Sequence, residues 1–171
     1  AHDGDFDAAL EELRATNLNK AEKKSDRSTN HGLIVIEQTG QAVCSLELNC
    51  ETDFVARNQE FKRFAHRLAS HVLSDATLTD REAVLQSSFS AAPEQTVDHM
   101  IKELAGKLGE NIQLGAVARY AIQADNVVEG YIHAGAIEGY AAHEGRLGVL
   151  VELGIADAAA LTDPGAVQSL V

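Results

Sequence analysis

Cysteine, aspartate and histidine side chains can supply a nucleophile, an orienting group and a base when a fold brings them together. Cys50 and Asp53 lie close in this sequence, and histidines occur along much of the chain. No spacing pairs a histidine with Cys50, and a cysteine at the end of a strand is usually a small core residue. We therefore expect no catalytic residues and do not expect an enzyme.

Metal and nucleotide sites also lack their usual patterns. His66 and His71 are five positions apart, so on a helix they point to different faces, whereas zinc-ligand pairs usually sit three or four apart. Gly106 and Lys107 are followed by Leu108, not by the hydroxyl residue of a phosphate-binding loop. The sequence predicts no metal site, no cofactor and no direct binding of a nucleotide.

The composition favours a protein as the partner. The 171 residues are long enough for one sizeable domain, or for two small ones that share a core. The 14 basic residues face 26 acidic ones, and affinity for nucleic acid comes from clustered lysine and arginine. No apolar run approaches ~18 residues, so we expect no membrane span. Cys44 and Cys50 lack Cys-x-x-Cys spacing and are expected to be reduced, as is typical of a cytoplasmic protein.

The stretch from Leu48 to Asn58 is the one best suited to contact a partner. A strand is expected to end here and a helix to begin, with a polar and aromatic corner between them. Thr52 is predicted to be the helix N-cap. Phe54 is either presented to a partner or the first core residue of the next helix. Because Phe61 and Phe64 already supply the aromatic residues of that helix, we favour the first interpretation.

Hydrophobic periodicity predicts the strands that position this corner. Residues 33–36 and 42–48, separated by a polar segment with a glycine, are typical of a β-hairpin with one apolar face. Three further strands are predicted at 114–122, 127–133 and 148–153, where β-favouring residues alternate.

Helices are predicted to cover the apolar face of the hairpin. The cleanest stripe has apolar residues at helical spacing, namely Phe61, Phe64, Ala65, Leu68, Ala69 and Val72. A capping box that begins at Thr79 predicts a helix with Leu78 as its hydrophobic staple, and Pro93 and Gly109 bracket a further helix.

The start of the chain predicts a short amphipathic helix. Its apolar face is formed by Phe6, Ala9, Leu10 and Leu13, with Asp3 or Asp5 as the N-cap. The polar residues 20–27 that follow are expected to form a linker, and residues 162–168 resemble the first turns of a further helix.

Four segments together resemble the elongation factor Ts family. They are the corner Leu48–Asn58, the basic linker 21–27, the junction Gly106–Ile112 and the strand Gly145–Leu153. The resemblance implies an α+β fold, with two antiparallel β-sheet subdomains covered by helices and preceded by the last helix of a small ubiquitin-associated-like helical domain. The implied divisions are residues 1–18 for this remnant, 19–31 for the linker, 32–123 for the N-subdomain of the core and 124–171 for a truncated C-subdomain.

The resemblance also implies a function, guanine-nucleotide exchange on the GTPase elongation factor Tu. Asp53 and Phe54 are then expected to enter the GTPase near its Mg²⁺ site, and the exchange corner is expected to consist of Thr52, Asp53, Phe54, Val55 and Arg57. The secondary partner contacts that it implies are His133, His143 and Arg146. The segment Ala134–Ala142 is longer than the family pattern, so either histidine can take the family position.

One alternative is a passive protein-binding or dimerisation module of the same fold without exchange activity. Homodimerisation is therefore left open.

Overall fold

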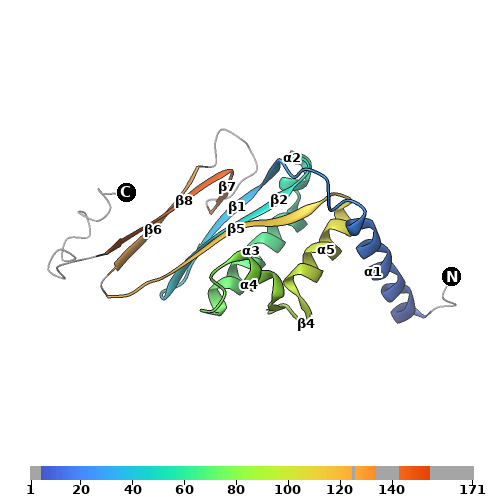
Figure 1. Ribbon diagram of the computed structural model, residues 1–171, viewed down its shortest axis with the longest axis horizontal. Coiled ribbons are helices and arrows are strands. Elements are labelled where there is room, and N and C mark those ends of the chain that lie inside the picture. The colour runs from blue at the N-terminus through green and yellow to red at the C-terminus, as the bar shows by residue number, and fades with distance from the viewer. Residues whose placement is uncertain (1–4, 125, 134–142, 155–171) are drawn as a thin grey trace.

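The computed structural model describes residues 5–124, 126–133 and 143–154 of the chain (Figure 1). It has an α+β architecture in which helices and antiparallel sheets form separate layers. Three predictions fall outside the described residues: Asp3 as N-cap, the long segment Ala134–Ala142 and the helix at 162–168.

A four-stranded antiparallel sheet in the order β5-β2-β1-β7 forms the centre of the molecule. Its strands are β1 (His31–Gln38), β2 (Ala42–Cys50), β5 (Ile112–Ala121) and β7 (Glu144–Gly145). The predicted hairpin is confirmed, because β1 pairs with β2 in continuous register from His31 opposite Cys50 to Gln38 opposite Val43. Along β2 the side chains of Cys44, Leu46 and Leu48 are buried on the face toward the helices.

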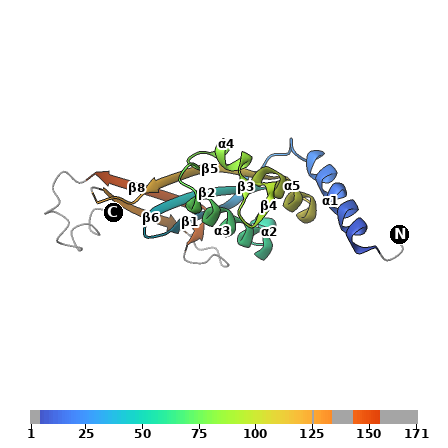
Figure 2. The same cartoon turned by 90° about the horizontal axis from the view of Figure 1, so that it is seen from below.

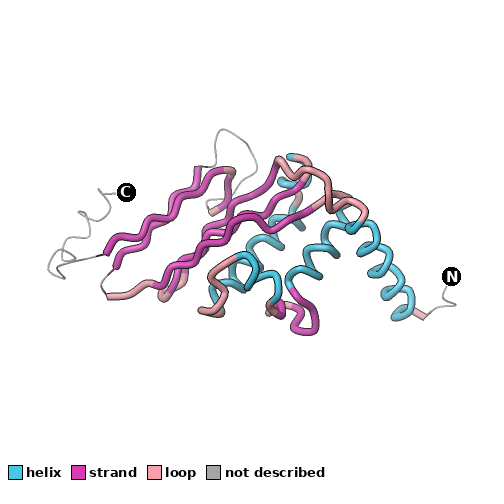
Figure 3. Tube along the Cα trace, viewed as in Figure 1, coloured by secondary structure: helices cyan, strands magenta, loops and turns pink. Residues whose placement is uncertain are grey.

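Two long helices cover that face, α3 (Gln59–Ser74) against β1 and β2, and α5 (Val97–Leu108) against β5 (Figures 1 and 3). The predicted stripe of α3 is confirmed, since all of its members are buried: Phe61, Phe64, Ala65, Leu68, Ala69 and Val72. Gly109 ends α5 in the left-handed conformation at φ 79°, which favours glycine.

Helix α1 (Phe6–Glu22) is longer than predicted. It continues through Lys20 to Glu22, into the residues assigned to the linker. Asp5 is its N-cap, as one of the two predicted candidates. The helix packs on α5 at the end of the molecule opposite to β6 (Asn126–His133) and β8 (Leu147–Gly154) (Figure 1). The approach is close: a Cβ atom added to Gly106 would lie 2.1 Å from the carbonyl oxygen of Asn17.

Two predicted helix starts were wrong. Asp80, not Thr79, caps the short helix α4 (Arg81–Gln86), because its side chain accepts the hydrogen bond from the backbone N–H of Ala83 at 2.9 Å. Pro93 does not begin α5, since it lies in an edge strand and Thr96 is the N-cap. Proline is tolerated in an edge strand because it leaves no ladder hydrogen bond unmade there. The short elements are α2 (Asp53–Ala56), α4 (Arg81–Gln86), β3 (Ser88–Phe89) and β4 (Ala92–Thr96).

A second sheet, β6 (Asn126–His133) paired with β8 (Leu147–Gly154), lies against the opposite face of the central sheet (Figure 2). Ile36, Val43 and Val128 form a small apolar cluster between the two sheets. The outer face of the second sheet exposes Tyr131 and Leu147. β7 lies in the segment assigned to the C-subdomain but pairs with β1, so the two parts of the core share a sheet.

Within the ranges that the structure describes, no helix is both long and apolar enough to cross a membrane.

Candidate functional site

The corner between β2 and α3 is built around a short helix, α2. The backbone of Thr52 is extended, and its side chain caps the helix by accepting from the N–H of Val55 at 3.4 Å. Thr52 is therefore the N-cap, as predicted. Ala56 is buried and Val55 packs partly against the core, so one side of α2 is fixed to the rest of the fold.

Phe54 lies on the other side of α2 and is exposed. Its relative accessibility is 82%, compared with 0% for Phe61 and 8% for Phe64. The interpretation of Phe54 as a core residue is therefore wrong. Soluble proteins expose single apolar residues commonly, so exposure alone does not make a site. Here the exposed ring stands on a helix whose opposite side is anchored in the core.

Asp53 is held on the corner by an ion pair with Arg57, one helical turn away. The two side chains are 41% and 45% exposed. Pairs of this kind are worth only about 0.3–0.5 kcal/mol in water. A binding partner with a suitable donor can therefore replace Arg57 at little cost, which leaves Asp53 both oriented and available.

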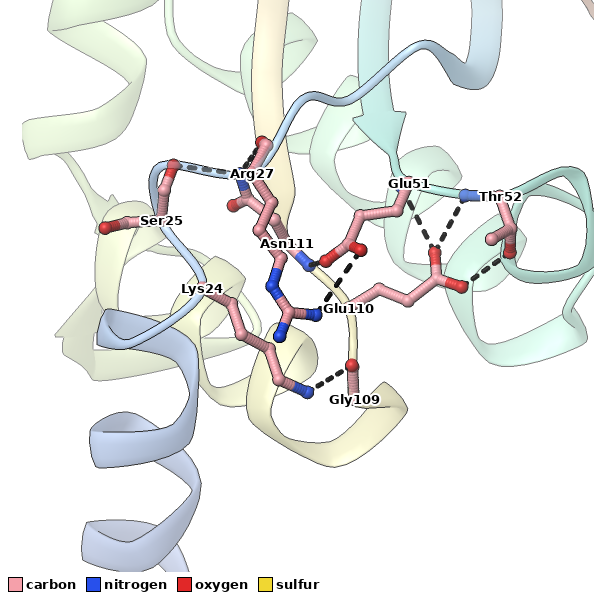
Figure 4. Close-up of polar contacts among 8 residues, drawn as sticks. All are labelled: Lys24, Ser25, Arg27, Glu51, Thr52, Gly109, Glu110 and Asn111. Carbon is pink, nitrogen blue, oxygen red and sulfur yellow. Dashed lines mark hydrogen bonds and ion pairs between the residues drawn. The ribbon is translucent and has the colours of Figure 1, made fainter.

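Glu110 fixes the entrance to the corner from a distant part of the chain (Figure 4). One carboxylate oxygen accepts the backbone N–H groups of Glu51 and Thr52 at 3.1 and 3.0 Å. The other accepts the hydroxyl of Thr52 at 2.5 Å. We did not predict this role for Glu110, although it belongs to the junction 106–112 that carried the family resemblance. No local pattern indicates this role, because Glu110 lies two residues before β5 and reaches the corner only through the pairing of Ile112, the first residue of β5, with Cys50, the last residue of β2.

A second set of contacts runs beside the first and reaches the segment after α1 (Figure 4). The side chain of Glu51 accepts the backbone N–H of Asn111 at 2.7 Å and lies 3.5 Å from the guanidinium of Arg27. The amide of Asn111 donates to the carbonyls of Ser25 and Arg27 at 2.9 and 2.6 Å. The ammonium of Lys24 donates to the carbonyl of Gly109. The corner, the start of β5 and residues 24–27 are therefore joined by hydrogen bonds.

Cys50 is at the base of the corner but is unsuited to act as a nucleophile. Its side chain is fully buried, and its Sγ lies 3.2 Å from the carbonyl oxygen of Thr52. Burial, with the nearby carboxylate of Glu110 as a second cause, raises the pKa of the thiol to about 12. At neutral pH the thiol is protonated, whereas the thiolate is the nucleophilic form. Burial likewise raises the pKa of Cys44 to about 12.

The histidines of α3 have separate structural partners. The ring nitrogens of His66 lie 2.7 Å from Glu37 and 3.3 Å from Glu144. His71 contacts the hydroxyl of Ser87 at 2.8 Å, and burial lowers its pKa. Among the residues that the structure describes, no group of three or more histidine, cysteine and acidic side chains is arranged to hold a metal ion.

The residues predicted as secondary contacts lie around β7 and the adjoining end of the second sheet. His133 is the last residue of β6 and pairs with Leu147, the residue that follows Arg146 in the sequence. The carbonyl of His143 accepts the N–H of Ile36 at 3.1 Å. Arg146 lines a pocket of about 130 Å³ together with His31 and Asn49 on the central sheet. His133, His143 and Arg146 thus share one region, while their role as partner contacts stays a prediction.

Comparison with known proteins agrees with the family resemblance found in the sequence. The family model described as "Elongation factor TS" matches residues 51–168. The chain is 37% identical to elongation factor Ts of Aquifex aeolicus (strain VF5) over 155 residues, which are 87% of this chain and 50% of that protein. It is 41% identical to the Hydrogenobaculum sp. (strain Y04AAS1) protein over 156 residues, 86% of this chain and 50% of that protein. For the Rhizobium rhizogenes (strain K84 / ATCC BAA-868) protein the identity is 39% over 164 residues, 95% and 50% of the two chains.

The chain thus spans about half the length of the curated relatives it matches. The family match begins at the corner itself, at Glu51, and continues through β8. It covers more than half of this chain, and the relatives extend it toward the N-terminus. The chain belongs to the elongation factor Ts family.

Proposed function

We propose that the protein is a guanine-nucleotide exchange factor that binds the GTPase elongation factor Tu and promotes release of GDP during translation elongation. Membership of the elongation factor Ts family supports this proposal. The single observation that carries it is the exposed ring of Phe54 on an anchored corner. The proposed activity belongs to the cytoplasm, needs no cofactor of its own and involves neither nucleic acid nor a membrane.

The proposed mechanism is thermodynamic linkage. A protein that binds the nucleotide-free GTPase more tightly than the loaded form weakens the binding of GDP and Mg²⁺ by the same factor. Shifting an equilibrium from 1:99 to 99:1 needs roughly 5.5 kcal/mol of differential affinity. A few well-placed side chains can supply this, because interface hot spots contribute about 2 kcal/mol or more each.

The side chains of the corner have distinct roles in this proposal. Phe54 enters between helices of the GTPase near its Mg²⁺ site, and its exposed ring is the apolar anchor. Asp53 disturbs the polar network around the ion after exchanging its contact with Arg57 for partner groups. Thr52 and Val55 set the position of α2, since one caps the helix and the other packs on the core. His133, His143 and Arg146 are proposed as a second contact region.

Helix α1 is proposed to be the last helix of a small ubiquitin-associated-like helical domain. Two of its apolar side chains support this, because Phe6 is 77% exposed and Leu13 is 55% exposed even though the helix packs on α5. An apolar face of this kind is expected to have further helices as partners.

Release of labelled GDP from elongation factor Tu tests the proposed function directly. Catalytic amounts of the chain should accelerate the release, and an unchanged rate at saturating concentration would contradict exchange activity.

A second candidate, the passive binding or dimerisation module, is favoured by the outer face of the second sheet, where Tyr131, Leu147 and Val149 are exposed. It predicts binding or self-association without any change in GDP release, so the same assay separates the two functions.

A further inference from the structure

Glu110 holds the corner through three hydrogen bonds although it lies more than fifty residues away in the sequence. It stands between the C-terminus of α5 and the start of β5 (Figure 4). Its carboxylate accepts hydrogen bonds from the backbone N–H groups of Glu51 and Thr52. These two residues lie between the end of β2 and the start of α2, so neither the strand pairing nor the helix provides an acceptor for their N–H groups. A backbone N–H in such a place needs another partner if it is to stay ordered.

The contact with Thr52 continues into α2. The hydroxyl of Thr52 donates to Glu110 and accepts from the N–H of Val55, so one oxygen joins the carboxylate to the first turn of the helix. Hydrogen bonds to an ionised carboxylate are shorter and about twice as strong as those between neutral groups. The carboxylate therefore orients the cap, and the cap orients the turn that carries Asp53 and Phe54.

The neighbouring residue strengthens the same connection from the other direction. Asn111 donates its N–H to the side chain of Glu51 and its amide to the carbonyls of Ser25 and Arg27. The amide side chain of Asn111 is buried, which excludes competing water. Two adjacent residues thus attach the corner to β5 and to the segment that follows α1 (Figure 4).

We propose that Glu110 and Asn111 are positioning residues for nucleotide exchange: they hold the corner in one conformation before the partner binds, so that Phe54 and Asp53 enter the GTPase without prior ordering. The inference rests on the proposed function for its consequence. Its structural basis, the ordering of residues 51–52 by Glu110, is independent of that function.

The experiment compares Glu110→Ala, Glu110→Gln and Phe54→Ala with the unaltered chain by two measurements. Amide hydrogen exchange at Glu51 and Thr52 reports the order of the corner, and release of labelled GDP from elongation factor Tu reports its function. Glu94→Ala is the matched control, because it removes a glutamate from an exposed position on β4.

For Glu110→Ala we expect amide exchange at Glu51 and Thr52 to become about tenfold faster or more, which corresponds to roughly 1.4 kcal/mol of lost hydrogen bonding. GDP release at a limiting concentration of the chain should slow by about the same factor. In both measurements Glu110→Gln should fall between Glu110→Ala and the unaltered chain, since its amide oxygen can still accept hydrogen bonds from the backbone N–H groups. Phe54→Ala should slow GDP release with both amides unchanged, and Glu94→Ala should change neither measurement.

Unchanged amide exchange in Glu110→Ala would overturn the inference, as would faster amide exchange with an unaltered rate of GDP release. If Glu110→Ala does not fold, Glu110→Gln decides by the same two measurements. If the unaltered chain does not accelerate GDP release, the proposed function fails, and the amides alone decide whether Glu110 orders the corner.

Discussion

Replacement of Phe54 by alanine separates a presented residue from a structural one. Complete burial of a phenylalanine side chain stabilises a protein by at most about 3 kcal/mol. Because Phe54 is 82% exposed, less than a fifth of that gain is available, and we expect Phe54→Ala to lower the free energy of unfolding by about 0.5 kcal/mol or less. A change of this size shifts the melting temperature by roughly 1–2 °C in a chain of this length.

The effect on the partner should be much larger. If Phe54 is an interface hot spot, its removal costs about 2 kcal/mol or more of binding free energy. This corresponds to a roughly thirtyfold weaker affinity for elongation factor Tu. The measurement is the concentration of chain that gives half-maximal acceleration of GDP release, determined with fluorescent GDP.

Phe64→Ala is the control for the same chemical change in the core. Phe64 is 8% exposed, and its ring centroid lies 5.6 Å from that of Phe89. Its removal should cost about 3–5 kcal/mol of folding stability, or roughly 6–20 °C in melting temperature. Equal losses of melting temperature in Phe54→Ala and Phe64→Ala, with GDP release per folded molecule unchanged, would refute the assignment of the corner.

Four further predictions use the same protein. Asp53→Ala should keep its melting temperature, because the exposed pair with Arg57 contributes little, yet slow GDP release; an unaltered rate would argue against a role for this carboxylate. Calorimetry with GDP or GTP in millimolar excess should detect no binding to the chain alone, since a net charge of -12 repels polyphosphate, and micromolar affinity would reopen the possibility of an enzyme. Amides of residues 6–13 should exchange faster than those of the later part of α1, which approaches α5 closely at Asn17, and uniformly slow exchange would contradict an unpartnered helix start. Cys44 and Cys50 should react with Ellman's reagent at neutral pH only after unfolding, because burial keeps both thiols protonated and inaccessible. Burial raises both pKa values from 9.0 to about 12, so the contribution of the two thiols to the free energy of unfolding is complete below about pH 9 and is lost as the pH rises toward 12.

Local sequence patterns predicted α3 and the hairpin of β1 and β2 well, because in each of them the apolar pattern follows the face that is buried. The stripe of α3 lies on one helix face, and the whole stripe is buried against the hairpin. Alternation along β2 likewise follows the two faces of the sheet. The cap at Thr52 was also predictable, since a cap needs only its own side chain and an N–H three residues later.

Where the sequence was misleading, competing local signals decided the outcome. Thr79 and Asp80 both fit a helix start, and only the structure shows that the carboxylate of Asp80 accepts the orphan N–H. Pro93 suits the first turn of a helix, but it equally suits an edge strand such as β4. The extension of α1 through Lys20, Ala21 and Glu22 reflects the high helix propensity of lysine, alanine and glutamate in a stretch that looked like a polar linker.

The role of Glu110 could not be read from local pattern at all. Its partners are 58 and 59 residues away, so they meet only once β2 and β5 have paired. The register places Cys50, the last residue of β2, opposite Ile112, the first residue of β5, so the residues after β2 lie beside those before β5. Two segments that each resembled the family therefore turn out to be parts of one hydrogen-bonded structure.

The energetic scale explains why such an arrangement matters for the proposed exchange. Ordering the backbone of one residue costs about 1–2 kcal/mol. If the four residues of α2 were disordered before binding, their ordering would consume about 4–8 kcal/mol. That cost is as large as the roughly 5.5 kcal/mol of differential affinity needed to invert the nucleotide equilibrium. A hot spot of about 2 kcal/mol at Phe54 could not offset it alone. In the proposed mechanism, the backbone that carries the exposed phenylalanine is therefore ordered before the partner binds. The contacts from Glu110 fix Glu51 and Thr52, and Thr52 in turn caps the first turn of α2.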